Sequence, residues 1–296
     1  MKKRLAITLG IILALSISGF ILITRPPVLI VTDLSFLSIY GTDRARTQLL
    51  RSSLSLFRLV KVVPIANDAG NDILLFAINA AATFSSRPYC VLFPMRFISG
   101  ARLYHEQFPE IPAILLEGRN VLDTRSQAME GFYRYRTDLE TDFYLAGLYS
   151  VILDKEKNGR ITVYVNRNIR NPAMDAFRRS LQETGTSAHF ASAYVQEPGI
   201  SDVSCVVLAG SGAEFLEKNN EIPVIFFTWL DPKETTAATV VVFDDSPLVQ
   251  VIPAVKMAAA GITDGQIASK ITILSTRITD SGILQRLKKA GAAGLE

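Results

Sequence analysis

Cysteine, histidine and tryptophan are scarce in this sequence. Its 296 residues include only two cysteines, two histidines and one tryptophan. Each cysteine lies within a short apolar run, Cys90 in Tyr89–Phe93 and Cys205 in Val203–Leu208. Such positions favour buried thiols over the alternative, a disulfide. Because neither run has metal-ligand spacing and histidine is scarce, we expect no metal site.

The common enzyme motifs are also missing. Thr32-Asp33-Leu34-Ser35 stands where a Gly-x-Gly-x-x-Gly fingerprint would follow the first apolar run, which disfavours a dinucleotide site. The sequence has no Gly-Lys-Ser/Thr phosphate loop and no Gly-x-Ser-x-Gly elbow. His105 and His189 have no obvious nucleophile partner in sequence. We therefore predict a protein that is not an enzyme and that needs no cofactor.

The charge distribution excludes another class of function. The formal net charge is +3, and Lys2, Lys3 and Arg4 account for all of it. The rest of the chain is electrically balanced, so it lacks the basic surface that nucleic-acid binding needs.

One long apolar segment follows those three basic residues. The run Leu5–Ile23 contains no charged residue, and as a helix it can cross a bilayer core of about 30 Å. Positive charge ahead of it predicts that residues 1–24 anchor the chain in the cell membrane, with the body on the periplasmic or outer side. A cleaved signal peptide is the alternative, with Ser16 and Ser18 small enough for a cleavage site. No cysteine follows the run, so a lipid-modified N-terminus is excluded.

Short apolar runs then alternate with helical patterns. Val28–Thr32 and Tyr89–Phe93 are typical of buried parallel strands, and Thr42–Val60 has the apolar spacing of a helix. The scheme repeats from a predicted helix at Asp138–Leu153. The pattern predicts an α/β fold with two lobes, each a doubly wound parallel sheet. In a helix predicted to run from Ser246-Pro247 to Ala260, Pro253 is expected to cause a kink or a shortening.

The chain is expected to pass between the lobes more than once. We assign residues 28–136 and 244–262 to the N-terminal lobe, and residues 137–243 and 266–296 to the C-terminal lobe. In such sheets the ligand binds beyond the carboxyl ends of the strands. The residues at those ends include carboxylates, arginines, amides and aromatic rings, which suit a polar small molecule with a flat or apolar face. The candidate ligand-binding residues are Asp33, Phe36, Asn67, Arg96, Arg119, Asn166, Trp229, Asp231 and Asp244, with Asp245 beside the last.

Each candidate also has a structural interpretation. Asp33 can form a turn, and Trp229 can cover the core behind it. Arg96 and Arg119 can be solvated or paired with aspartates, and Asp244 can simply lead into the next helix.

Three segments carry a resemblance to a known group of proteins. They are Asp33-Leu34-Ser35-Phe36, Glu140 with Tyr144-Leu145-Ala146-Gly147, and the late strand, turn and helix of Val240–Gly261. In these segments the chain resembles the type I periplasmic-binding-protein superfamily, and most of all the basic membrane protein and purine-nucleoside-receptor family. The resemblance implies two lobes that hold a small ligand, often a nucleoside, and it marks Asp33, Phe36, Trp229 and Asp244 or Asp245 as candidates. The chain departs from that family in having no lipid-attachment cysteine and in having Leu37 where an asparagine is usual.

The function that we expect is capture of a small polar ligand, such as a nucleoside, between two lobes outside the cytoplasm. An ABC permease would be the partner, and the membrane would be contacted through the N-terminal helix. One alternative is a membrane-tethered sensing module that reports a ligand to a partner without transport. The other is an anchored α/β enzyme with a nucleotide-type cleft.

Overall fold

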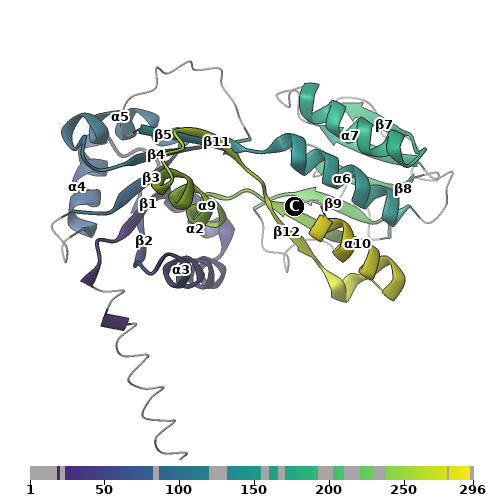
Figure 1. Ribbon diagram of the computed structural model, residues 1–296, viewed down its shortest axis with the longest axis horizontal. Coiled ribbons are helices and arrows are strands. Elements are labelled where there is room, and N and C mark those ends of the chain that lie inside the picture. Colours follow the sequence, from purple (N-terminus) through teal and green to yellow (C-terminus); the bar gives the residue numbers. More distant parts are fainter. Residues whose placement is uncertain are drawn as a thin grey trace, which may run out of the picture. The chain divides into compact units, whose positions relative to one another are not determined.

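The protein divides into two compact units, each with its own sheet, in a computed structural model (Figure 1). The structure describes residues 19–20, 24–82, 87–119, 132–154, 160–165, 171–192, 203–209, 221–229, 238–278 and 280–293. Unit 1 comprises residues 1–118, 123–135 and 247–265, and unit 2 comprises 119–122, 136–246 and 266–296. Most of the predicted anchor lies outside the described residues. Among the residues that are described, no helix has the length and apolar character needed to cross a bilayer.

The sheet of unit 1 has six strands in the order β11-β5-β4-β3-β1-β2. Strand β1 lies next to the edge strand β2, is buried over its whole length, and pairs in parallel with β2 on one side and β3 on the other. A continuous apolar sequence such as Val-Leu-Ile-Val suits this position because both faces of the strand are covered. The strands are β1 (Val28–Asp33), β2 (Val60–Ile65), β3 (Cys90–Pro94), β4 (Ala113–Gly118), β5 (Phe132–Thr137) and β11 (Asp264–Ile267).

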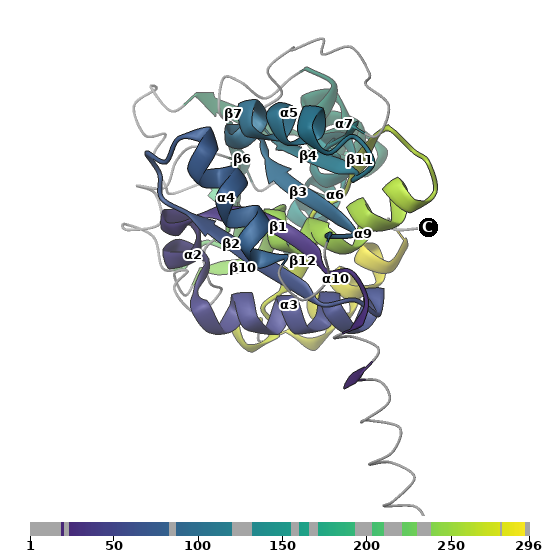
Figure 2. The ribbon, with the colours of Figure 1, turned by 90° about the vertical axis from the view of Figure 1, so that its left-hand side faces the viewer.

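Helices cover both faces of this sheet (Figures 1 and 2). On one face α4 and α5 pack over a core that includes Leu29, Ile78 and Phe93, while α3 packs against α9 on the other. The helices of unit 1 are α2 (Leu34–Tyr40), α3 (Thr42–Leu56), α4 (Asn71–Ala81), α5 (Ile98–Gln107) and α9 (Pro247–Ala259), with a short 3-10 turn at Met95–Phe97.

Unit 2 also has a six-stranded sheet. Its sheet has the order β12-β10-β9-β8-β6-β7. The pairs β6–β7, β6–β8, β8–β9 and β9–β10 are parallel, but the edge strand β12 runs antiparallel to β10. The prediction of a purely parallel sheet is therefore wrong at this edge. The strands are β6 (Arg160–Val165), β7 (Ala188–Ser192), β8 (Val203–Ala209), β9 (Val224–Phe227), β10 (Thr239–Asp244) and β12 (Lys270–Ile273).

Two helices of unit 2, α6 and α7, meet closely at a glycine. The helices of this unit are α6 (Leu139–Leu153), α7 (Asn171–Glu183) and α10 (Ser281–Ala293), with a 3-10 turn at Ser275–Arg277. A Cβ atom added to Gly147 on α6 would lie 1.8 Å from Ser180 Oγ and 3.1 Å from the Phe177 carbonyl oxygen of α7. The Leu-Ala-Gly sequence therefore lets two helices approach each other, and the packing of α6 on α7 accounts for Gly147.

Two local features differ from the sequence-based expectation. A seven-residue helix, α2, follows β1, where the sequence indicated only a turn at Asp33, because the Asp33 side chain accepts a hydrogen bond from Phe36 N and caps the helix. Helix α9 continues past Pro253 to Ala259, so of the two effects predicted for Pro253, a kink or a shortening, the shortening does not occur. The two free cysteines, Cys90 and Cys205, are both buried, as predicted.

Candidate functional site

The carboxyl ends of three neighbouring strands bring polar side chains together in unit 1. Strand β2 is added on one side of β1, and the next strand, β3, is added on the other side, so the order of the strands reverses at β1. In doubly wound sheets this switch point is where ligands bind, because the flanking connections leave on opposite faces and open a crevice. Asp33 ends β1, Asn67 follows β2 and Arg96 follows β3. With Ser35 they form what we call the switch-point cluster.

Asp33 is the centre of the switch-point cluster. Its Oδ1 accepts hydrogen bonds from Phe36 N at 2.7 Å and from the Ser35 hydroxyl. Its Oδ2 lies 2.8 Å from Arg96 Nη1. Burial by itself raises the pKa of Asp33, but the hydrogen bonds from Ser35 and Phe36 and the charge of Arg96 outweigh it and hold that pKa below its ordinary value. Asp33 is therefore ionised at neutral pH.

The other three members, Arg96, Asn67 and Ser35, contact one another in a chain and face solvent. Arg96 Nη2 donates to the Asn67 carbonyl oxygen at 3.2 Å, and Asn67 Nδ2 donates to Ser35 Oγ at 3.3 Å. The Arg96 side chain is 41% exposed, while that of Asp33 is 12% exposed. The cluster thus presents a positioned guanidinium, an amide and a hydroxyl to solvent around a mostly buried carboxylate. These groups suit recognition of hydroxyl, amine or carbonyl groups on a small molecule.

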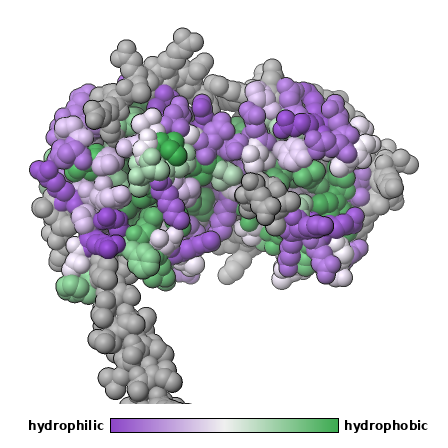
Figure 3. Space-filling model, viewed as in Figure 1, coloured by the Kyte–Doolittle hydropathy of each residue, from purple (hydrophilic) through white to green (hydrophobic). Residues whose placement is uncertain are grey.

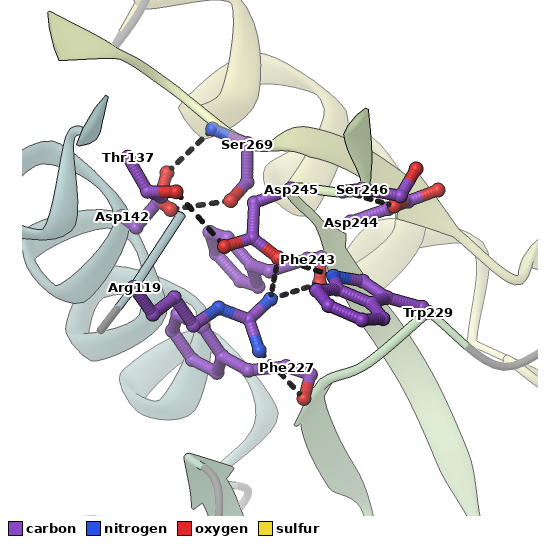
Figure 4. A network of polar contacts seen from close by, with 10 residues as sticks. All are labelled: Arg119, Thr137, Asp142, Phe227, Trp229, Phe243, Asp244, Asp245, Ser246 and Ser269. Carbon is purple, nitrogen blue, oxygen red and sulfur yellow. Dashed lines mark hydrogen bonds and ion pairs between the residues drawn. The ribbon is translucent and has the colours of Figure 1, made fainter. Parts of the chain in front are cut away.

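The corresponding region of unit 2 holds a second polar network, which is mostly buried (Figure 4). Arg119 Nη2 lies 2.8 Å from Asp245 Oδ1, and the Asp245 side chain is fully buried. The same guanidinium donates to the carbonyl oxygens of Phe227 and Phe243, each at 3.0 Å. Those two residues belong to β9 and β10, so Arg119 ties the strand ends together.

Asp245 receives two further hydrogen bonds in this network. Trp229 Nε1 donates to its Oδ1 at 2.7 Å, and Thr137 Oγ1 donates to its Oδ2 at 2.9 Å (Figure 4). Both carboxylate oxygens are thus occupied by protein groups. Trp229 as a whole residue remains 40% exposed. Because its N–H is already bonded to Asp245, the ring offers a ligand mainly its apolar face.

A buried acid lies next to this network. Asp142, on α6, accepts hydrogen bonds from Ser269 N at 2.9 Å and from Ser269 Oγ at 2.5 Å. Burial is the main cause that raises the pKa of Asp142 to about 7. The Asp245 charge raises it further, while the Ser269 hydrogen bonds and Arg119 lower it. The side chain therefore titrates near neutral pH.

The structure separates the predicted site residues into four groups. Asp33, Asn67 and Arg96 meet in unit 1, and Arg119 and Trp229 meet through Asp245 in unit 2. Two candidates are buried. Phe36 stacks on Tyr40 with ring centroids 5.3 Å apart, and Asp244 accepts a hydrogen bond from Ser246 N at 2.9 Å just before α9. The last two candidates, Asn166 and Asp231, lie outside the described residues.

Sequence reasoning missed Ser35, Thr137, Asp142 and Ser269. Ser35 could have been found, because it stands two residues after Asp33 in an Asx-type turn that also caps α2. The contact between Asp142 and Ser269 spans 127 residues, and no local pattern marks it. Among the described residues, no group of three or more acidic, histidine or cysteine side chains is arranged to hold a metal ion.

Two surface hollows lie away from both networks. In unit 1, residues including Arg87, Tyr104 and Phe108 line a hollow of about 390 Å³. In unit 2, Thr141, Tyr144 and other residues of α6 and α7 line an open groove of about 480 Å³. The hollow of unit 1 is lined by helix ends and surface side chains, and the groove of unit 2 also includes Asp138, which directly follows β5, and Gln266 of β11. No member of the switch-point cluster lines either hollow. We place the candidate site at the switch-point cluster, because doubly wound sheets bind ligands at that point.

Comparison with known proteins identifies the fold. No protein-family profile matches the sequence, and no curated protein matches it. Solved structures do match. A transcriptional activator of the comK gene from Bacillus halodurans has 12% identity and a TM-score of 0.62, over 91% of this chain and 98% of that one. A solute-binding protein of an ABC transporter system from Conexibacter woesei has 11% identity and a TM-score of 0.59, over 92% and 98%. A LacI transcriptional regulator from a Rhodococcus species has 13% identity and a TM-score of 0.51, over 84% and 97%.

These similarities establish an α/β fold of two parallel-sheet lobes of the type I periplasmic-binding-protein kind. Identities this low show the fold and not the family. The matched proteins are described as binding proteins and regulators, not as enzymes.

Proposed function

We propose that this chain is an extracytoplasmic solute-binding protein that captures a small polar ligand between its two lobes and presents it to an ABC importer. The observation that carries this proposal is the switch-point cluster. Asp33, Asn67 and Arg96 come from three adjacent strand ends and remain partly open to solvent. A cluster needed only for stability would be expected to be more fully enclosed, as the Arg119–Asp245 pair is.

The chemistry of the cluster narrows the class of ligand. The ionised Asp33 accepts hydrogen bonds, and the guanidinium of Arg96 donates them. A ligand with vicinal hydroxyl groups, or with an amine and a carbonyl group, satisfies both. A nucleoside carries such vicinal hydroxyl groups, and we propose it as the first ligand to test.

A thermal-shift screen tests the proposal. Purified protein is heated with nucleosides, sugars and amino acids, each well above typical dissociation constants. A ligand at about 100 times its Kd stabilises the native state by about 2.7 kcal/mol. We expect at least one class of compound to raise the melting temperature. The absence of a shift from every class would contradict the proposal.

Variants of the switch-point cluster test whether the ligand that raises the melting temperature binds there. We expect Asp33→Asn and Arg96→Met to abolish the shift produced by the active compound. Arg87→Met is the matched control, because Arg87 forms an exposed ion pair with Glu110 outside the cluster. A shift that survives both cluster variants would refute the switch-point cluster as the binding site.

A sensing module without transport would use the same ligand site. The partner distinguishes the two functions. Copurification of the full chain with a permease from its native membrane supports import, and copurification with a kinase supports sensing.

A further inference from the structure

Helix α3 carries an apolar stripe on its solvent side. Leu50 and Leu54 are spaced i and i+4, so they lie on one face of the helix, and Phe57 is the residue that caps its C-terminal end. Their exposed fractions are 62%, 54% and 60%. Figure 3 shows apolar surface over α3 beside hydrophilic side chains. Single exposed apolar residues are common on protein surfaces, but three grouped on the last turns of one helix and its C-cap indicate an interaction surface.

Basic side chains flank this stripe. Arg46 and Arg51 are exposed, and helical spacing places them on either side of Leu50. The helix contains three arginines and one aspartate, so its net charge is +2. Asp43 lies in the first turn, where it pairs with Arg46 at 3.9 Å. An apolar centre with arginines at its edges fits the boundary between lipid headgroups and acyl chains.

The stripe also lies where the chain enters unit 1. Arg58 Nη1 donates to the Pro26 carbonyl oxygen at 3.2 Å, and Val28 N donates to the Leu59 carbonyl oxygen at 2.9 Å. Residues 26–28 are therefore beside the end of α3. The apolar run predicted to cross a bilayer ends at Ile23, only three residues before Pro26. A membrane that holds this run would lie close to the stripe.

The orientation of α3 keeps the ligand site away from this surface. Strand β2 begins at Val60, just after α3, and pairs with the start of β1 at Val28. The exposed stripe thus lies toward the amino ends of the strands, whereas the switch-point cluster lies at their carboxyl ends. Contact through α3 leaves the carboxyl edge of the sheet open.

We propose that the α3 face formed by Leu50, Leu54 and Phe57, with Arg46 and Arg51, docks on an anionic phospholipid surface. The apolar residues enter the headgroup boundary, and the arginines bind lipid phosphates. This contact fixes the orientation of unit 1 on the membrane. It goes beyond ligand binding and does not depend on which ligand the switch-point cluster takes.

Site-specific fluorescence on the full chain tests this proposal. Leu54→Cys is labelled with an environment-sensitive dye, since the native Cys90 and Cys205 are buried and resist labelling. The protein is reconstituted into vesicles of phosphatidylcholine and phosphatidylglycerol with brominated acyl chains. We expect the dye at position 54 to shift to the blue and to be quenched by bromine. The control is Phe76→Cys on α4, a residue that is 75% exposed on the other face of the sheet, where we expect no quenching.

Charge variants test the electrostatic part. In the Leu54→Cys background, Arg46→Ser and Arg51→Ser are each expected to lower the ratio of docked to undocked protein by about fivefold. Pure phosphatidylcholine vesicles should lower it in the same direction. Urea unfolding midpoints equal to those of the unsubstituted protein confirm that these exposed changes leave the fold intact.

Three results would overturn the proposal. The first is equal quenching at positions 54 and 76 in anionic vesicles. The second is protection of position 54 in native membranes but not in lipid vesicles, which assigns the face to a protein partner. The third is protection in detergent that increases with protein concentration, which assigns it to a second copy of the chain.

Discussion

Removal of Arg119 is the most informative perturbation of unit 2. Its guanidinium pairs with the fully buried Asp245 and donates to the Phe227 and Phe243 carbonyl oxygens. Methionine at position 119 keeps the length of the side chain but leaves the carboxylate buried with hydrogen bonds from Trp229 and Thr137 and no counter-charge. An uncompensated buried charge is costly because water can no longer solvate it.

The cost can be stated as an order of magnitude. Breaking a buried pair from one side costs roughly 3–5 kcal/mol. Because Arg119 is 19% exposed, we place Arg119→Met near the lower end, at about 3 kcal/mol. For a unit of this size that corresponds to a melting temperature about 9 °C lower. Asp245→Asn should cost less, since the amide still accepts hydrogen bonds. The double variant should be more stable than the sum of the single effects predicts, with a coupling of about 2 kcal/mol.

Trp229 provides the assay. It is the only tryptophan in the chain, and it donates directly to Asp245, so its fluorescence reports both the network and the unfolding of unit 2. Urea unfolding followed at this signal gives the free energies of the two single variants and the double variant. Arg178→Met is the control, because Arg178 pairs with Asp175 on the exposed surface of α7 and should cost under about 1 kcal/mol. A cost for Arg119→Met no larger than that of the control would refute the buried-pair account.

Three further predictions concern single sites. The pKa of Asp142 is about 7 in the native state and about 3.9 in the unfolded state, so the stability of the wild-type protein should decline as pH rises from 4 to 7. Asp142→Asn should remove that decline. A difference in urea midpoint between wild type and variant that is the same at every pH would contradict this prediction. Gly147→Ala should destabilise unit 2 by about 1–3 kcal/mol through its clash with Ser180, and Ser180→Ala should recover part of the loss in thermal melts. Arg96→Met should cost under about 1 kcal/mol in a urea titration, because that side chain is 41% exposed; a larger cost would show that the switch-point cluster stabilises the fold.

Most of the regular structure could be predicted from the sequence because the signals are local. Val28–Asp33 is buried on both faces and has the continuous apolar pattern that identifies a buried parallel strand. The predicted helix from Thr42 corresponds to α3, which ends at Leu56 because Phe57 adopts a left-handed backbone with a φ of 48°. That ending depends on the packing of the chain near Arg58 and Pro26, and no sequence pattern marks it.

The strand and site features that were missed depend on contacts between distant residues. Strand β12 runs antiparallel because the chain returns to β10 at the edge of the sheet, pairing Val241 with Ile273, and a four-residue strand carries no signal of direction. The meeting of Asp33 with Arg96 follows from the order of the strands, since β1 and β3 are neighbours although β2 lies between them in sequence. The sequence identifies both residues as lying at strand ends, but it does not show that their side chains pair.

The two polar networks imply different consequences of substitution. In unit 2, both oxygens of Asp245 are bonded within the protein, and its side chain has no exposed surface. A ligand cannot reach a carboxylate that has no exposed surface, so changes there should act on stability. In unit 1, the guanidinium of Arg96 is partly open while its partner Asp33 stays ionised. A ligand that bonds to Arg96 replaces water and leaves the Asp33 pair intact, so substitutions there should alter ligand selectivity with little change in the stability of the fold.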